Sequence, residues 1–380
     1  MDNKLSALLT AEFTLSDELI YLNHAGVSPW PNRCRQAINQ FASENTVFGS
    51  KNYPTWIQKE TFLRQQIAEL INAPSADDVA LLKNTSEALS VVASGIDWRA
   101  GDTVIISSEE FPSNRIVWQA LADSGVKLIQ VDLHQNHPPE EALLAAVDNT
   151  TRLIAISSVQ YSTGLRLNLE ILGQFCKKNN ILFCVDAIQS IGALEFDVQT
   201  IHADFVMADG HKWMLGPEGL GLFYCRADLR DQLKLHQYGW HMTEDYLNFV
   251  DQHWEPAHSA RRFECGSPNM LGIHALSASL SLHQEIGMKI IESLVLEKSQ
   301  LLFDAINASN NLGLITDSSK GRYGGIVTFR HNSGNHQKLY ETLMGENVMC
   351  ALRGGGIRYS PHFYTPDDKL LRAVEIADKF

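Results

Sequence analysis

Short apolar runs alternate with longer amphipathic stretches between residues 79 and 225 of this 380-residue chain. Short apolar runs bounded by turn residues predict buried strands, and apolar positions three or four apart predict helices. Strands are predicted at residues 79–83, 103–107, 127–131, 153–157, 181–186, 204–208 and 221–225. Helices are predicted at residues 86–94, 114–124, 139–147 and 169–179.

Strands that alternate with helices build a mostly parallel sheet with helices on both faces. We therefore predict an α/β fold with a seven-stranded sheet. A loop around Lys212 joins the last two strand candidates, and no helix lies between them. A parallel pair needs a long crossover connection, so one antiparallel strand is expected here.

The pattern changes after residue 270. It predicts helices at 271–286, 290–308 and 337–344, a strand at 325–330 and a glycine-rich turn between Arg353 and Arg358. A chain of this length favours two domains. We assign residues 15–260 to a large domain and residues 261–380, together with 1–14, to a smaller α+β domain.

Composition narrows the range of partners. The formal net charge of -13 argues against nucleic acid and anionic membranes. No apolar run approaches the length that spans a bilayer, and the N-terminal residues lack the pattern of a secretion signal. The six cysteines form no C-x-x-C pair, which is typical of reduced thiols and not of disulfides or a metal site. We expect a cytoplasmic protein without a bound metal.

A lysine and an acid follow two of the predicted strands. Asp186 ends one buried strand, and Lys212 follows another within the sequence Asp209-Gly-His211-Lys212. Burial can lower the pKa of a lysine enough for imine chemistry, and a carboxylate can keep a pyridine nitrogen protonated. The pair therefore predicts pyridoxal 5'-phosphate as the cofactor. Gln189 is expected to hydrogen-bond the phenolic oxygen of that cofactor.

Two further segments fit parts of the same cofactor. Thr85 and Ser86 open a predicted helix, where free N–H groups and the helix dipole favour a phosphate, although an ordinary helix cap has the same pattern. Phe111 follows the strand at 103–107, where open α/β sheets bind ligands, and it can stack on a planar ring or pack as a hydrophobic staple. His211 is predicted to lie on the phosphate side.

Together these segments resemble the class V aminotransferase family of pyridoxal-phosphate enzymes, which includes cysteine desulfurases, kynureninases and isopenicillin N epimerase-like proteins. The similarity runs from residue 21 to residue 364. The resemblance implies fold type I, with Lys212 as the catalytic residue in a Schiff base with the cofactor. It also implies the ring-nitrogen, ring-oxygen, stacking and phosphate roles for Asp186, Gln189, Phe111, Thr85 and Ser86.

The resemblance also implies how the substrate is bound. Arg358 matches the arginine that holds the substrate α-carboxylate, a task suited to its bidentate fork, and Arg353 can assist. Asn23 and His24 match a loop that closes over the substrate.

One segment implies a second copy of the chain. Gly266 and Ser267 lie in a stretch that resembles the family segment reaching the cofactor phosphate of the neighbouring subunit. The resemblance therefore implies a homodimer with shared active sites.

Three positions depart from the desulfurase pattern. Asp209 stands where those enzymes carry a serine on the phosphate, so it must point elsewhere, be bridged by His211 or be protonated. Tyr161 replaces an asparagine near the ring oxygen. No cysteine lies between Arg353 and Arg358, where desulfurases carry their sulfur-accepting thiol. Cysteine desulfuration is therefore disfavoured.

We predict an aminotransferase that acts on a small amino acid and a keto acid. The alternatives are an epimerase or a β- or γ-eliminating lyase, similar to kynureninase or selenocysteine lyase, because the same carbanion serves all of these reactions. A desulfurase using Cys265 or Cys350, and a cofactor-binding regulator without turnover, are the remaining hypotheses.

Overall fold

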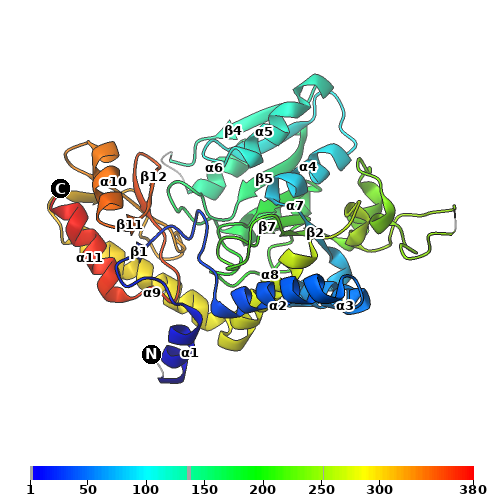
Figure 1. Cartoon of the computed structure of the whole chain (residues 1–380). Helices are drawn as coiled ribbons and strands as arrows, with labels where there is room; N and C mark the ends of the chain where they lie inside the picture. Colours follow the sequence, from blue (N-terminus) through cyan, green and yellow to red (C-terminus); the bar gives the residue numbers. More distant parts are fainter. Residues whose placement is uncertain (1–2, 135–137, 251) are drawn as a thin grey trace.

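A seven-stranded sheet forms the centre of the larger part of the molecule (Figure 1). The computed structural model describes residues 3–134, 138–250 and 252–380, so residues 1 and 2 of the predicted N-terminal segment 1–14 lie outside it. Within the described sheet, β8 alone runs antiparallel to its neighbours, and the predicted topology is confirmed. The strand order is β2 (Val79–Leu82), β8 (Gly221–Cys225), β7 (Phe205–Asp209), β6 (Leu182–Asp186), β5 (Thr151–Ser157), β3 (Thr103–Ser107), β4 (Lys127–Val131).

Helices cover both faces of this sheet because successive strand residues point to opposite sides. In β3, Val104 and Ile106 pack with α4 (Thr85–Gly95) and α5 (Ser113–Gln119). Ile105 faces the other side, which is covered by α3 (Tyr53–Leu70), α6 (Pro139–Ala145), α7 (Leu169–Asn179) and α8 (Met270–Ile286). The helix predicted at 114–124 ends at Gln119 and continues as a 3₁₀ turn, Ala120–Ser124.

Three N-terminal helices were not predicted. They are α1 (Asn3–Glu12), α2 (Asn32–Phe48) and α3, and the last two pack against α8. In α2 only Cys34 is fully buried, but Ala37, Ile38 and Phe41 share its face and are partly buried, so this short apolar stripe was overlooked in the sequence. None of the helices in the described ranges combines the length and the apolar character needed to cross a membrane.

A smaller sheet of four antiparallel strands lies beside the large one (Figure 1). Its core contains Phe329, Tyr359 and Leu370, and the N-terminal residue Ile20 joins the same cluster. β1 (Ile20–Tyr21) pairs in parallel with β11 (Val348–Met349). The domain bounds remain a prediction. The other elements of this part are α9 (Met288–Asn307), β9 (Leu312–Leu314), β10 (Val327–His331), α10 (His336–Gly345), β12 (Ala351–Arg353), β13 (Gly356–Tyr359) and α11 (Asp367–Asp378).

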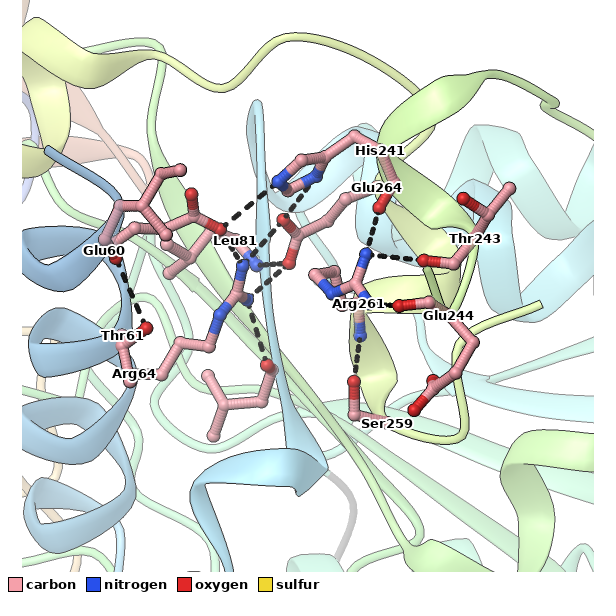
Figure 2. A network of polar contacts seen from close by, with 12 residues as sticks. Glu60, Thr61, Arg64, Leu81, His241, Thr243, Glu244, Ser259, Arg261 and Glu264 are labelled. Carbon is pink, nitrogen blue, oxygen red and sulfur yellow. Dashed lines mark hydrogen bonds and ion pairs between the residues drawn. The ribbon is translucent and has the colours of Figure 1, made fainter. Parts of the chain in front are cut away.

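Buried charges close the edge of the large sheet at β2 (Figure 2). Arg64 of α3 forms ion pairs with Glu60 and Glu264 and donates to the carbonyl of Val79 at 3.2 Å. Glu264 also accepts a hydrogen bond of 2.7 Å from the N–H of Leu81. These contacts satisfy backbone groups that an edge strand otherwise leaves open.

His241 completes this charged cluster. Its ring nitrogens lie 3.5 Å from Glu60 and 3.5 Å from Glu264. In the described part of the chain, these three side chains are close enough to share a metal ion. The guanidinium of Arg64 already pairs with both carboxylates, so the cluster is best described as an internal ion network.

Candidate active site

The predicted site residues follow the carboxyl ends of the parallel strands. Asp186 is the last residue of β6, and Arg358 approaches from β13 of the small sheet. Carboxyl ends of parallel strands meet at one edge of a sheet, so the topology itself brings these segments together. The segments that follow β2, β3, β6 and β7 carry Thr85, Phe111, Gln189 and Lys212.

Asp186 is buried, Lys212 is partly buried, and each affects the ionisation of the other. Burial raises the pKa of Asp186, although the N–H of Ile188 donates to its Oδ1 at 3.1 Å and the charge of Lys212 opposes the shift. Burial lowers the pKa of Lys212, the charge of Asp186 opposes this, and the charge of Arg358 adds to it. The lysine amine is therefore biased toward the neutral form that imine chemistry requires.

Phe111 presents an exposed aromatic ring to this amine. The ring is 42% exposed, and its centroid lies 5.8 Å from Lys212 Nζ. The Tyr161 ring packs against it edge to face, with 5.1 Å between centroids. This exposure argues against a hydrophobic staple and suits the stacking of a planar ligand ring.

The predicted phosphate turn joins the starts of two helices. Thr85 and Ser86 begin α4, and Asn84 caps the helix by accepting from the N–H of Glu87 at 2.9 Å. Ser86 Oγ lies 2.7 Å from Ser113 Oγ at the start of α5. Ser113 was not predicted as a site residue, and only the pairing of the two helices brings it here.

Asp209 points into this turn. Its Oδ1 accepts hydrogen bonds from the N–H and the hydroxyl of Thr85, the latter at 3.1 Å. Burial raises the pKa of Asp209 to about 6, against the hydrogen bonds from Thr85. His211 Nδ1 lies 3.5 Å from Asp209 Oδ2 and is buried without a hydrogen-bond partner. The alternative in which Asp209 points away from the phosphate turn is therefore wrong. Bridging by His211 and protonation remain as the two other expectations.

Gln189 is held in place by two contacts. Its Oε1 accepts from the indole N–H of Trp213 at 2.9 Å, and its Nε2 donates to the carbonyl of Ala25 at 3.1 Å. An amide nitrogen has two hydrogens, so one remains for a ligand oxygen. The predicted contact with the cofactor ring is therefore compatible with the observed orientation.

Glu110 is a buried acid that sequence reasoning missed. Its carboxylate accepts from the N–H of Ser157 at 2.8 Å, from the Ser157 hydroxyl, from Gln160 at 3.0 Å and from Asn114 at 2.8 Å. Burial raises its pKa, and its charge contributes to the raised pKa of Asp186. In the sequence, its position directly before Phe111 was the feature that could have pointed to Glu110.

Arg358 is a buried cation without a carboxylate partner among the described residues. Its Nη1 donates to the carbonyl of Tyr161 at 2.7 Å, and its Nη2 donates to Asn23 Oδ1 at 3.2 Å. Its Nε is buried and has no hydrogen-bond partner. Burial lowers the pKa of Arg358 to about 10, and the nearby charge of Arg353 adds to the shift. An anionic ligand group would stabilise this arrangement.

The other predicted substrate residues differ in position. Arg353 is exposed, and its Nη1 donates to the carbonyl of Leu352 at 2.8 Å. His24 is fully buried, with Nδ1 on the carbonyl of Ser360 at 2.8 Å and Nε2 on the hydroxyl of Tyr364 at 2.7 Å. Both nitrogens of His24 are therefore engaged within the protein, and its predicted contact with substrate stays a prediction.

Gly266 and Ser267 follow the 3₁₀ turn Ala260–Phe263. Apart from Gly266 and its chain neighbours, no atom of the described residues lies within 4 Å of the point where a side chain at this position would begin. This open position is compatible with close approach by another chain, and the predicted homodimer with shared sites remains a prediction.

The connection before Arg358 is a two-residue turn. Gly354 and Gly355 join β12 to β13 with φ angles of 60° and 78°, a left-handed conformation that favours glycine. Cys350 is buried, which raises the pKa of its thiol to about 12. Cys265 is partly exposed, and its Sγ lies 3.3 Å from Gln237 Oε1.

The family model for class V aminotransferases matches residues 20–362, and the chain belongs to this family. A relative named "Probable cysteine desulfurase" from Methanothermobacter thermautotrophicus is 28% identical over 373 residues, or 92% of each chain. The "Uncharacterized aminotransferase YcbU" of Bacillus subtilis is 30% identical over 339 residues, or 88% of each chain.

Solved structures share the fold. A cysteine desulfurase from Thermococcus onnurineus has a TM-score of 0.86 at 23% identity, and the match covers 98% of this chain and 96% of that one. A mutant of C-DES, with glycine linked covalently to its pyridoxal-phosphate cofactor, has a TM-score of 0.89 at 21% identity and covers 100% and 99%. The predicted fold type I is confirmed.

The cofactor of this family is pyridoxal 5'-phosphate, and the residues present fit it. The observation that tests the fit is the buried Arg358 Nε, which has no hydrogen-bond partner and suits the carboxylate of an amino acid joined to the cofactor. Lys212 and Asp186 would hold the aldehyde and the ring nitrogen. The individual roles of these residues remain predictions.

Proposed function

We propose that this chain is a pyridoxal-phosphate lyase that breaks the carbon–sulfur bond of a small sulfur-containing amino acid by β-elimination, without using a thiol of its own. The proposal depends chiefly on the turn formed by Gly354 and Gly355, which leaves no cysteine between Arg353 and Arg358. The nearby thiol of Cys350 is buried, and burial raises its pKa to about 12 despite the charge of Arg358. The relative named as a probable cysteine desulfurase supports a substrate in which a carbon–sulfur bond is broken.

Transamination, the reaction that the sequence favoured, becomes the second candidate. Membership of the class V family does not distinguish it from elimination, and the relative YcbU carries an aminotransferase name. Both reactions begin with loss of the substrate α-proton. They differ in whether a leaving group on the β-carbon departs next.

The side chains support the first step in both cases. When bound, pyridoxal phosphate supplies an electron-withdrawing ring. The buried fork of Arg358 is suited to bind the α-carboxylate of the substrate. Lys212 is suited to accept the α-proton at Nζ because burial favours its neutral form. Asp186 is suited to face the ring nitrogen, because a positive charge there would oppose the burial that raises the pKa of its carboxyl.

Elimination then needs only a substrate with a good leaving group. The Cβ–S bond breaks with both electrons on sulfur. After protonation the sulfur leaves as hydrogen sulfide from L-cysteine or as a persulfide from L-cystine, and water releases the remaining fragment as a keto acid and ammonia. No protein thiol enters this balance. A desulfurase instead transfers sulfur to a cysteine and releases alanine, which requires a reactive thiolate.

The test is a product assay on the cofactor-loaded protein with L-cystine, L-cysteine and L-alanine, without added keto acid. Elimination is expected to release ammonia and keto acid in equal amounts from a sulfur amino acid, and a Lys212→Ala variant is expected to release neither. Alanine as product would indicate desulfuration. Turnover only after addition of a keto acid, without free ammonia, would support transamination instead.

A further inference from the structure

The phosphate turn of this chain already contains a carboxylate. Asp209 Oδ1 accepts from the N–H and the hydroxyl of Thr85, the first residue of α4. A helix N-terminus favours anions because its first N–H groups are free and its dipole is positive. Asp209 therefore uses donors of the kind that a phosphate group also needs.

A buried base lies next to this acid. Asp209 Oδ2 lies 3.5 Å from His211 Nδ1, slightly beyond hydrogen-bond distance. This nitrogen has no other partner in the described structure. The two side chains are only 13% and 14% exposed, so water screens them weakly. The neutral ring can place its single hydrogen on Nδ1, toward this carboxylate, but only an added proton cancels the negative charge of the pair.

The surrounding charges do not neutralise Asp209. Glu218 and Asp186 repel its negative charge, and Lys212 attracts it. His211 is also affected by Lys212, whose charge opposes protonation of the ring. Two acids and one lysine act on Asp209, so the turn keeps a negative charge when Asp209 is ionised. Without an added proton, this charge repels a phosphate group, which carries about two negative charges above pH 6.

We propose that the cofactor phosphate binds together with one proton, which is held between Asp209 Oδ2 and His211 Nδ1. The proton removes the repulsion between carboxylate and phosphate. A serine at this position, as in the desulfurase pattern, needs no such proton. The inference concerns cofactor binding alone and is independent of the reaction that follows.

The direction of the pH effect follows from the two side chains before the cofactor binds. Burial raises the pKa of Asp209 to about 6 and lowers the pKa of His211 to about 4. Between pH 7 and 8.5 the pair is therefore mostly without the proton and must take it up on binding. Uptake of one proton makes affinity fall about tenfold for each pH unit.

The experiment measures cofactor affinity and not turnover. Cofactor-free protein is titrated with pyridoxal phosphate and with pyridoxal, which lacks the phosphate, between pH 7 and 8.5, and binding is followed by tryptophan fluorescence. Two variants are compared with wild type. Asp209→Asn keeps an oxygen for the Thr85 N–H, and Asp209→Ser introduces the desulfurase residue; circular dichroism checks that both are folded.

In wild type, the affinity for pyridoxal phosphate divided by the affinity for pyridoxal is expected to fall about tenfold for each pH unit. Both variants are expected to remove that difference in slope and to bind pyridoxal phosphate at least about tenfold more tightly at pH 8.5. The proposal is wrong if pyridoxal shows the same slope as pyridoxal phosphate in wild type. It is also wrong if the folded variants keep the wild-type slope.

Discussion

Arg358 donates from Nη2 to Asn23 Oδ1 at 3.2 Å, and this contact joins the small sheet to the N-terminal segment at the substrate side of the site. Asn23 forms a bridge to Ser360, two residues after Arg358. The N-terminal segment and the small sheet therefore both hold the guanidinium in position.

Replacing Arg358 by lysine is expected to lower kcat/KM for the amino acid about 10- to 150-fold. The charge is kept, but the fork that holds a carboxylate is lost, and a hydrogen bond between charged groups contributes about 1.5–3 kcal/mol. Asn23→Ala removes one supporting contact and is expected to cost less than about tenfold. Steady-state kinetics check both. An equal loss with the corresponding amine that lacks the carboxylate would contradict the assigned role.

Local patterns were sufficient to predict the large sheet and the proximity of Asp186 and Lys212. Strands such as β6 are apolar runs ending in a polar residue, and Asp186 and Lys212 follow such runs. Because parallel strands share one edge for their carboxyl ends, sequence order alone implied that these residues meet. The antiparallel β8 was predictable because a parallel pair needs a long crossover connection, and no helix lies between β7 and β8.

Contacts between distant segments were not predictable. The packing of α2 on α8, for example, could not be derived from either segment alone. The four hydrogen bonds of Glu110 depend on the relative placement of β5 and α5, which are far apart in sequence. Whether Asp209 faced the phosphate turn or avoided it likewise depended on side-chain geometry.

Replacement of Cys265 by serine and of Cys350 by alanine is expected to leave elimination within about twofold of wild type. Burial keeps the Cys350 thiol protonated, and only the thiolate is an effective sulfur acceptor. The assay is ammonia release from L-cystine by each single variant and by the double variant. A large loss in a variant that is folded and binds cofactor would show that a thiol takes part. Cys34→Ala, at another buried cysteine, is the matched control for packing.

Glu264→Gln is expected to destabilise the fold by about 3–5 kcal/mol, because it leaves the charge of Arg64 only partly compensated in a buried site (Figure 2). It also weakens the contact with the N–H of Leu81 at the sheet edge. Urea unfolding followed by circular dichroism measures the change. Glu375→Gln on the exposed face of α11 is the control and is expected to leave stability nearly unchanged, because water screens its ion pairs. Similar effects of the two substitutions would rule out an important role for the network.

Three buried histidines around Trp213 predict that stability falls as the pH drops below about 6.5. Burial lowers the pKa of His24 to about 4 and the pKa of His362 well below its usual value. His362 Nε2 contacts the carbonyl of Trp213 at 3.0 Å and its Nδ1 accepts from the N–H of Phe363 at 2.9 Å, so a second proton on this ring has no acceptor. His283 also contacts the Trp213 carbonyl at 3.0 Å, but its Nδ1 lies 3.2 Å from the carbonyl of Ser279, and burial still lowers its pKa. The unfolded chain binds these protons near pH 6.5 and the folded chain does not, so each such site costs about 1.4 kcal/mol of stability per pH unit below that value.

The measurement that checks this effect is the free energy of unfolding in urea at pH 7.0, 6.0 and 5.0. His362→Asn, which keeps a donor for the Trp213 carbonyl, is expected to be less stable than wild type at pH 7.0 but to lose less on acidification. His258→Asn removes an exposed histidine and is the control, with the wild-type pH slope expected. If all three proteins lose the same free energy between pH 7.0 and 5.0, the neutral His362 is not a source of acid sensitivity, and the other buried histidines, His24 and His283, must account for it.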